Sequence, residues 1–218
     1  MTSFSGFHQE DFAVFSVEGL DNRMNRIKQV IRPKLEWLGE HFAPALTVGV
    51  GSEMFVHVAK HARRTVNPPD DTWVAWAHDK RGYKKHPHFQ IGLWGTHLFV
   101  WYAVIYESPA KEQIGQALEK QIDEVLRIVP DHFRWSADHT VPESTPQSVL
   151  GKEGLLQLTD RLQRVKKAEL LCGIRIERDD PVLADGPLLL QKLEETFDVL
   201  TRLYRLAAPA AVAAASPR

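Results

Sequence analysis

The chain has 218 residues, a formal net charge of −1 at pH 7 and 44% apolar residues, values typical of a soluble globular protein. This length fits one large domain or two small ones and suffices to bury a core. The single cysteine excludes an internal disulfide and a cysteine-based zinc site, and the balanced charge argues against a protein that coats nucleic acid over its whole surface.

We expect no secretion signal in the N-terminal part. Glu10 and Asp11 stand where a secretion signal would be apolar, and no basic run precedes them. The longest apolar run, residues 98–106, is far too short for a membrane helix. We therefore expect a cytoplasmic protein without a membrane segment, and the sequence leaves its oligomeric state open.

Residues 12–15 are expected to form a short strand or an extended lead-in. An apolar stripe at spacings of three and four then predicts helical structure from Asp21 onwards. Pro33 interrupts this stripe, because proline lacks an amide proton and clashes with the preceding turn. We expect two helices with continuous facing, or one kinked helix, that end before Pro44. A glycine-bearing loop is expected at residues 47–53.

The middle of the chain shows the alternating pattern of β-strands. Gly95 and Thr96 form a turn between the third and fourth strands, which we predict to pair as an antiparallel hairpin. In the third strand, Phe89, Ile91 and Leu93 are expected to face the side opposite to His88, Gln90 and Gly92. The four expected strands are 54–61, 72–78, 88–94 and 97–106.

The rest of the chain alternates between helices and strands. A helix begins at Ser108-Pro109, and the last strand and last helix are followed by an Ala-rich tail at residues 207–218, which we expect to be disordered. A run of hairpin-joined strands with helices on either side in the sequence predicts an α+β fold. We expect a mostly antiparallel β-sheet with helices packed on one side, in a single two-layer domain over residues 1–206.

Residues 57–88 concentrate the unusual chemistry of the chain. They contain seven Lys and Arg residues and three Asp residues, and seven minus three leaves a surplus of four positive charges. Five of the ten histidines also lie here. A local positive cluster on a balanced protein favours an anionic partner.

The candidate ligand-binding side chains lie in two parts of this segment. Arginines bind phosphate or carboxylate through two parallel hydrogen bonds, and a tyrosine between cations suits stacking on a base. A solvated loop whose lysines keep an edge strand soluble explains the same charges without a ligand. The candidates are His57, Lys60, His61, Arg63, Arg64, Lys80, Arg81, Tyr83 and Lys84.

The two parts belong to one site only under a condition. If strands 54–61 and 72–78 are antiparallel neighbours, Arg63 and Arg64 lie about a strand length, on the order of 20 Å, from the 79–87 loop. One small ligand then touches both only if the 62–71 connection folds back along the sheet. We therefore weight His57, His61, Arg63 and Arg64 above the lysines of the loop.

His57 and His61 are four residues apart, which places both rings on one face of a helix or of a strand. Val58 stands where a zincin motif has glutamate, and no third ligand has a defined spacing, so we predict no metal and no cofactor. The pair are candidates for a catalytic general base. Two partly buried, hydrogen-bonded histidines are the alternative.

Three functions fit these observations. The interpretation that we favour is binding of a small anionic, phosphorylated ligand beside residues 57–64. An RNA- or single-stranded nucleic-acid-binding module using the same cations is the first alternative, and a hydrolase or transferase with a histidine general base is the second.

The chain contains two long and distinctive stretches, EMFVHVAKHARRTVNPPDDTWVAW and KRGYKKHPHFQIGLWGTHLFVWYAVIYESP, and the shorter IRPKLEWLGEHFAP and VKKAELLCGIRIER. In these stretches it resembles the YktB-like family of bacterial proteins of unknown function. The resemblance runs from Phe12 to Tyr204. It implies a compact α+β domain with a mostly antiparallel sheet, and it brings no activity, ligand or catalytic residue.

Overall fold

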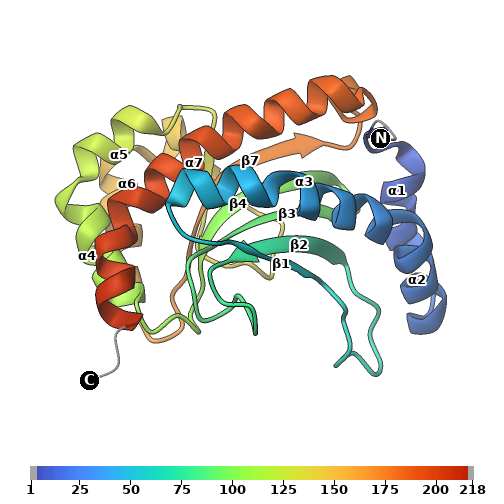
Figure 1. Ribbon diagram of the computed structural model, residues 1–218, viewed down its shortest axis with the longest axis horizontal. Coiled ribbons are helices and arrows are strands. Elements are labelled where there is room, and N and C mark those ends of the chain that lie inside the picture. The colour runs from blue at the N-terminus through green and yellow to red at the C-terminus, as the bar shows by residue number, and fades with distance from the viewer. Residues whose placement is uncertain (1–3, 216–218) are drawn as a thin grey trace.

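The structure, a computed structural model, describes residues 4–215 and the side chains of residues 4–207. Within these residues the strands form one seven-stranded sheet in the order β1-β2-β3-β4-β7-β5-β6, in which every neighbouring pair is antiparallel (Figure 1). The strands are β1 (Phe55–Val58), β2 (Asp71–Ala77), β3 (His88–Trp94), β4 (His97–Val104), β5 (Arg134–Ser136), β6 (Thr145–Pro146) and β7 (Leu170–Glu177).

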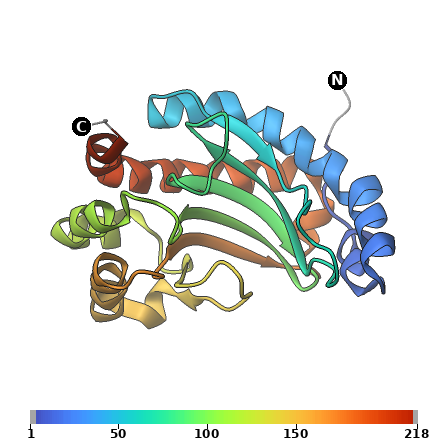
Figure 2. The same ribbon diagram turned by 90° about the horizontal axis from the view of Figure 1, so that it is seen from below.

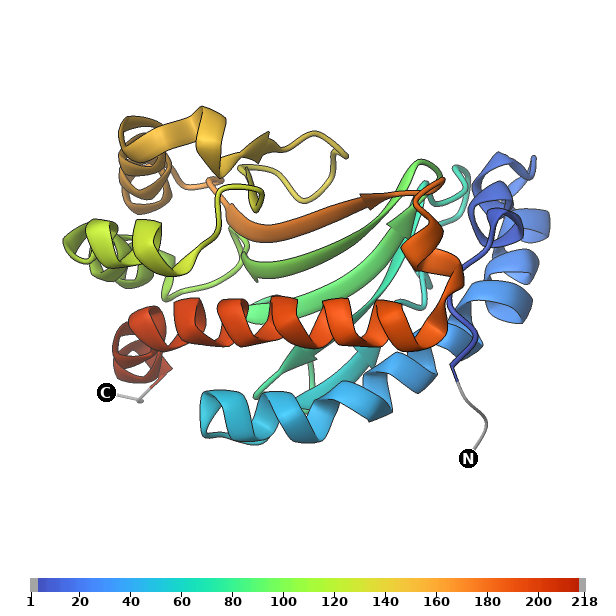
Figure 3. The ribbon, with the colours of Figure 1, turned by 90° about the horizontal axis from the view of Figure 1, so that it is seen from above.

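The long helices lie on one face of the sheet. Figure 3 shows α3 and α7 side by side across that face, while α4–α6 and α1–α2 lie beyond its two ends. This arrangement confirms the predicted α+β class with an antiparallel sheet. The helices are α1 (Gln9–Ala13), α2 (Leu20–Arg26), α3 (Arg32–Val50), α4 (Lys111–Lys120), α5 (Ile122–Ile128), α6 (Gln147–Arg164) and α7 (Gly186–Ala215), with a π-helical segment at Ile27–Ile31 and 3-10 turns at Val14–Ser16 and Pro181–Ala184.

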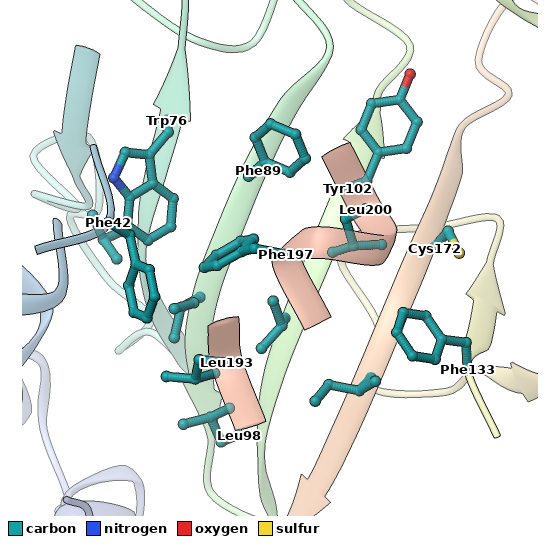
Figure 4. Close-up of a cluster of buried hydrophobic side chains, with 14 of the residues drawn as sticks. Phe42, Trp76, Phe89, Leu98, Tyr102, Phe133, Cys172, Leu193, Phe197 and Leu200 are labelled. Carbon is teal, nitrogen blue, oxygen red and sulfur yellow. The ribbon is translucent and has the colours of Figure 1, made fainter. Parts of the chain in front are cut away.

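The main core lies between the sheet and these helices. Phe197 of α7 packs its ring against Phe42 of α3 and against Trp76 and Phe89 of the sheet, with ring centroids 5.0–5.9 Å apart (Figure 4). The Trp76 indole is fully buried and donates a hydrogen bond from Nε1 to the Gly39 carbonyl oxygen at 2.9 Å. The Trp76 indole is thus satisfied within the core, whereas the buried Tyr102 hydroxyl has no hydrogen-bond partner among the described residues.

The predicted β3–β4 hairpin is confirmed. His88 pairs with Ala103 and Leu93 pairs with Leu98, so the chain turns at Gly95-Thr96. The side chains alternate as the sequence predicted, because Phe89, Ile91 and Leu93 belong to the core below the helices. His88, Gln90 and Gly92 consequently face the other side of the sheet, which carries no long helix (Figure 2).

Two predictions for the N-terminal part are wrong. Residues 12–15 are helical rather than extended, because Asp11 accepts a hydrogen bond from the His8 backbone amide at 2.7 Å and starts a helical turn. Helix α3 continues through Pro44 to Val50, where we expected an end and then a loop. The continued part packs closely on α7, since the bare Cα of Gly49 lies against Thr201 and an added Cβ would be 2.9 Å from Thr201 Cγ2, and such tertiary contacts outweigh a local signal for a helix end.

The C-terminal half differs in smaller ways. The helix expected from Ser108 begins at Lys111 and is divided at Gln121 into α4 and α5. Helix α7 continues to Ala215, into the segment expected to be disordered, whereas residues 216–218 and the side chains beyond residue 207 lie outside the described part. The prediction for the tail thus stays a prediction. None of the described helices has both the length and the apolar content needed to cross a membrane.

Candidate functional site

The sheet face without long helices carries a hollow, which we call the open-face hollow. It is shallow, with a free volume of about 20 Å³, close to that of a single water molecule. Its walls come from β2, β3, β4, β7 and the 137–144 loop. The lining residues are Asp71, Trp73, Gln90, Trp94, His97, Phe99, Trp101, Ser136, Asp138, His139, Val141, Pro142 and Leu171.

Two glycines shape the aromatic floor of the hollow. Gly92 stands directly opposite Phe99, and an added Cβ there would lie 2.3 Å from Phe99 Cζ. Gly173 stands opposite Trp101 in the same way, with Trp101 Cε3 at 2.9 Å from an added Cβ. The two rings therefore lie over bare backbone, and they stack with an interplanar angle of 25°. Both rings are buried, so they form a small second core on this side of the sheet, together with Ala103, Ile105 and Leu171.

The two histidines that β3 and β4 contribute to this face, His88 and His97, are neutral at pH 7. Burial lowers the pKa of His88 to about 3 and that of His97 to about 4. His88 Nδ1 donates to the His86 carbonyl oxygen at 2.7 Å, so its Nε2 accepts from the Gln90 amide nitrogen at 3.2 Å. Gln90 is thereby held in place at the wall of the hollow.

Asp71 is the acid of the hollow. Burial raises the pKa of its carboxyl to about 6, although the nearby Arg64 guanidinium and His139 imidazole act in the opposite direction. A cation from the 59–70 connection and an imidazole from the 137–144 loop thus both approach the first residue of β2. The carboxyl is poised to change its protonation state near neutral pH.

Arg32, His61 and Arg64 form a second group beside Asp71, which we call the arginine–histidine cluster. Burial lowers the pKa of His61 to about 4, and the Arg64 and Arg32 guanidinium groups add to this effect. His61 Nε2 is 3.1 Å from Thr72 Oγ1, and its ring packs edge-on against Trp73 at 5.4 Å. Because Trp73 also lines the hollow, the cluster and the hollow are contiguous.

The arginines of this cluster make few bonds. In the described part of the chain neither Arg32 nor Arg64 forms an ion pair with a carboxylate. The buried Arg32 Nε has no hydrogen-bond partner there, and Arg64 reaches only the carbonyl oxygens of Asn67 and Pro68 at 3.4 Å. His61 has a backbone φ of 50°, in the left-handed region that non-glycine residues rarely adopt.

The structure separates His57 from His61. Strand β1 ends at Val58, so the expectation that both rings share one face of a longer strand is wrong. His57 is the penultimate residue of β1, and its Nε2 is 2.9 Å from the Asp79 carbonyl oxygen. His57 therefore contacts the 79–87 loop, and His61 belongs to the arginine–histidine cluster.

Tyr83 brings the 79–87 loop back over the sheet. Its hydroxyl accepts a hydrogen bond from Trp73 Nε1 at 2.9 Å, and its ring lies between those of His57 and His88. Burial raises the pKa of the Tyr83 hydroxyl to about 12. Tyr83 thus packs against the open face as a structural contact of the loop.

The remaining basic candidates do not converge with Arg64. Lys84 pairs with Glu107 at 3.4 Å, and the Arg81 backbone amide donates to Asp79 Oδ1 at 2.8 Å. Lys60, Lys80 and Arg63 form no side-chain hydrogen bond or ion pair among residues 4–207. β1 and β2 are antiparallel neighbours, so the loop begins at the end of β2 away from Arg63–Arg64, and Tyr83 reaches back from it to Trp73 near the start of β2.

Asp138, His139 and Glu169 form the one group in the described part of the chain with the spacing of metal ligands; their ligand atoms lie within 4.8 Å of one another. The atoms are engaged in other bonds, however. His139 Nδ1 is 2.7 Å from Glu169 Oε2, and Asp138 Oδ1 accepts from the backbone amide and hydroxyl of Thr140. We therefore describe the group as hydrogen-bonded side chains and assign no metal to it.

Sequence analysis missed Arg32, Asp71, His139 and Glu169 as site residues. Arg32 lay inside a helix pattern, and Asp71 was counted only as an acid that offsets the basic segment. His139 and Glu169 meet across 30 positions of sequence, and no spacing rule joins them. The sequence offered one signal for this region. The polar positions within strand 88–94 mark a sheet face that the helices do not cover, where these residues meet.

The comparisons with known proteins agree with the sequence motifs. Over residues 7–204 the chain matches the family described as Domain of unknown function (DUF1054). It is 56% identical over 200 residues to a UPF0637 protein of Bacillus velezensis and 54% identical to one of Bacillus licheniformis, covering 92% of this chain and 95% of each relative. A UPF0637 protein of Bacillus cytotoxicus is 49% identical, over 92% of this chain and 96% of its own length.

These names carry no activity and no ligand. They confirm the predicted membership of an uncharacterised bacterial family. Residues 7–204, which match the family, include the whole sheet, the open-face hollow and the arginine–histidine cluster. The chain belongs to the DUF1054 family.

Proposed function

We propose that the protein binds a small phosphorylated ligand, with the phosphate at the arginine–histidine cluster and the rest of the ligand over Trp73 in the open-face hollow. One observation carries the proposal. Arg32 and Arg64 flank His61 without forming an ion pair in the part of the chain that is described. Arg64 is exposed and Arg32 donates to the Ala59 carbonyl oxygen at 3.5 Å, so both guanidinium groups keep donors for a phosphate, which can accept two parallel hydrogen bonds from each.

The backbone supports the same interpretation. The left-handed conformation at His61 costs free energy, and such strain persists where the surrounding structure imposes it, often at ligand sites. His61 follows the end of β1 at Val58, and the chain makes a turn there in which the Arg64 backbone amide donates to the His61 carbonyl oxygen at 3.0 Å. This turn holds Arg64 close to His61.

Asp71 gives the proposed site a dependence on pH. A phosphate at Arg64 lies close to this carboxyl, and two like charges in a partly buried site repel each other. Protonated Asp71 relieves the repulsion, so binding should be tighter below pH 6 than above it. The pKa of Asp71, about 6, lies in the pH range over which phosphate affinity should change.

The alternative of a nucleic-acid-binding module has less support. It needs Tyr83 free to stack on a base and the lysines of the loop free to contact a backbone. Tyr83 is instead bonded to Trp73, and Lys84 is paired with Glu107. The arginine–histidine cluster is also compact, which suits one phosphate better than a row of them.

The test is a calorimetric titration of the purified protein with inorganic phosphate, adenosine monophosphate and a short single-stranded RNA. Arg64→Ala should weaken binding of the first two by about 10- to 150-fold, which corresponds to about 1.5–3 kcal/mol for hydrogen bonds to a charged group. Arg202→Ala is the matched control, because Arg202 is an exposed arginine on α7. It should bind like the wild type.

Two results contradict the proposal. One is that the wild type binds neither phosphate nor nucleotide at physiological salt. The other is that Arg64→Ala and Arg202→Ala bind equally well. Binding of the RNA alone, with a steep dependence on salt, would favour the nucleic-acid alternative.

A further inference from the structure

Strand β1 forms one edge of the sheet. It neighbours β2 alone in the strand order, and α3 packs over it on the helix-covered face. Directly after the strand, the Ala59 backbone amide donates to the Trp73 carbonyl oxygen at 2.9 Å, so the amide of Ala59 faces β2. Because backbone groups alternate in direction along a strand, those of His57 also face β2, whereas those of Val56 and Val58 point outward, away from β2.

The outward backbone groups of Val56 and Val58 form no hydrogen bond among residues 4–207. The preceding outward amide, that of Met54, is satisfied, because it donates to Thr47 Oγ1 of α3 at 3.0 Å. The Val56 side chain is 37% exposed, although its inner side lies against Gly39 of α3. An exposed edge with free donors and acceptors is a template on which an extended chain can add a strand.

The arginine–histidine cluster lies at the C-terminal end of the same edge. Arg32 Nη2 donates to the Ala59 carbonyl oxygen at 3.5 Å, and the Arg64 backbone amide donates to the His61 carbonyl oxygen at 3.0 Å. Lys60, which lies between Ala59 and His61 in the sequence, is exposed. An extended chain that runs along β1 therefore has cations beside one of its ends.

The other end of β1 carries the opposite charge. Glu53 precedes the strand, is exposed and forms no ion pair within residues 4–207. An extended chain on this edge is thus favoured if it carries an anion beside Arg32 and Arg64 and a cation beside Glu53. The edge therefore selects both the charge and the direction of what binds to it.

We propose that the edge of β1 binds an extended phosphorylated segment of a protein, with the phosphate at the arginine–histidine cluster. The inference rests on the proposed function, because the phosphate site is the same, and it names the source of the phosphate as a phosphoserine or phosphothreonine side chain. The segment adds a strand beside β1 and exchanges backbone hydrogen bonds with Val56 and Val58. A lysine or arginine towards its other end lies beside Glu53.

The surfaces beside the cluster favour this class of ligand. The open-face hollow has a free volume of about 20 Å³, so the body of a larger ligand needs another surface, and the edge of β1 is the adjoining one with free hydrogen-bonding groups. Backbone pairing there depends little on the side chains of the segment, and the phosphate fixes the position of the segment along the strand. Free phosphate uses the cluster alone and should bind more weakly.

The first experiment measures the fluorescence anisotropy of a labelled seven-residue peptide with the purified full chain at physiological salt. The peptide alternates valine and threonine and carries a phosphoserine near one end and a lysine at the other. It should bind more tightly than inorganic phosphate. The same peptide without the phosphate is the control and should bind at least about 10-fold more weakly, because the hydrogen bonds from the guanidinium groups are lost.

Two methylated versions of the phosphopeptide test the backbone pairing with the wild-type protein. One version is N-methylated at every odd backbone amide and the other at every even one, and only one of these sets can face β1. One version should therefore bind at least about 10-fold more weakly than the other, because it has lost its donors to the edge. A peptide held by its phosphate alone would bind equally in both versions.

Val56→Pro blocks the edge from the side of the protein. Proline lacks the amide donor, and the amide at this position faces away from β2, so the ladder keeps its bonds. The variant should bind the phosphopeptide about 10-fold more weakly and inorganic phosphate as the wild type does. Val56→Thr is the matched control, because it keeps the amide and a branched side chain and should bind both. Arg64→Ala should weaken the binding of both.

The inference is overturned if the wild type binds inorganic phosphate but not the phosphopeptide, or if the two methylated versions bind equally. It is overturned equally if Val56→Pro binds the phosphopeptide like the wild type. A dimer in sedimentation that Val56→Pro dissociates would also overturn it, because a second copy of the chain then occupies the edge. If the wild type binds neither phosphate nor the phosphopeptide, the proposed function itself fails and the inference falls with it.

Discussion

The two faces of the sheet differ in what covers them. Helices α3 and α7 lie across one face, and every large side chain that β3 and β4 direct towards them is apolar or a buried tyrosine. The opposite face carries histidines, a glutamine, an aspartate and aromatic rings, and short loops are its main cover (Figure 2). One strand supplies both faces by simple alternation.

The helix-covered face mainly stabilises the fold, whereas the open face carries the polar and titratable groups. On the helix-covered face, the buried Trp76 bonds its indole nitrogen to a backbone carbonyl, and the apolar rings interlock around Phe197. On the open face, a carboxyl with a raised pKa and an arginine without an ion pair remain beside a hollow. Groups that cost folding free energy are kept where a ligand has access, which is the usual position of a functional site.

The largest expected effect comes from placing a methyl group in the aromatic floor. Gly92→Ala puts a Cβ 2.3 Å from Phe99 Cζ and 2.7 Å from the Thr72 carbonyl oxygen. The ring must lift and the β2–β3 contact must adjust, so the free energy of unfolding should fall by about 2–3 kcal/mol. Urea unfolding measures this change, and phosphate titration should show weaker binding as well.

Two control variants test whether the two faces of the sheet differ in function. Gly82→Ala adds a Cβ with nothing within 4 Å and should change the free energy of unfolding by less than about 0.5 kcal/mol. Ile91→Val, on the helix-covered face of the same strand, should cost about 1 kcal/mol and leave phosphate binding unchanged. Equal loss of binding in Ile91→Val and Gly92→Ala would mean that the faces are not functionally distinct.

The next largest effect is expected at Asp71, whose ionised carboxyl lowers the free energy of unfolding, so that removing its charge should stabilise the protein. Its pKa is about 6 in the folded protein and near 3.8 otherwise, so between these values the folded state holds a proton that the unfolded state lacks. The free energy of unfolding therefore falls as the pH rises from about 4 to about 6. Arg64, His139, Asp70 and Tyr83 are the titratable or charged groups that face it.

Asp71→Asn removes this penalty. The variant should be more stable than the wild type by about 1–2 kcal/mol above pH 7, and the difference should vanish near pH 4. Asp70→Asn is the control, because the Asp70 side chain is 73% exposed and pairs with Arg23 at the surface. A loss of stability in Asp71→Asn at neutral pH would show that the carboxylate is stabilised rather than strained by its surroundings.

Much of the fold was predictable because it follows local rules. The alternation of Phe89, Ile91 and Leu93 with polar neighbours fixes which face meets the helices, and Gly95-Thr96 fixes the turn. The continuation of α3 through Pro44 was not predictable, since the last turn of this helix packs on α7, where Gly49 meets Thr201 across 201 − 49 = 152 positions of sequence. Tertiary contacts here override a local signal for a helix end.

The candidate site was predictable only in part. Arg64 and His61 belong to a basic segment that the sequence displays openly, and the structure places them together. Arg32 and His139 join that region through folding alone, one from the start of α3 and the other from a loop between strands. The charge pattern therefore pointed to one part of the proposed site, and the residues that come from other segments could be recognised only in the three-dimensional structure.

The smallest expected effect separates the two basic groups of the 57–88 segment. Lys84 forms a half-exposed pair with Glu107 at 3.4 Å, at the other end of β1–β2 from Arg64. Lys84→Ala should change the free energy of unfolding by less than about 0.5 kcal/mol, because exposed ion pairs contribute little. Its phosphate affinity should remain within about twofold of the wild type, against a loss of at least about 10-fold for Arg64→Ala. A loss in Lys84→Ala as large as that in Arg64→Ala would show that the loop, which Tyr83 already ties to Trp73, closes over the bound phosphate.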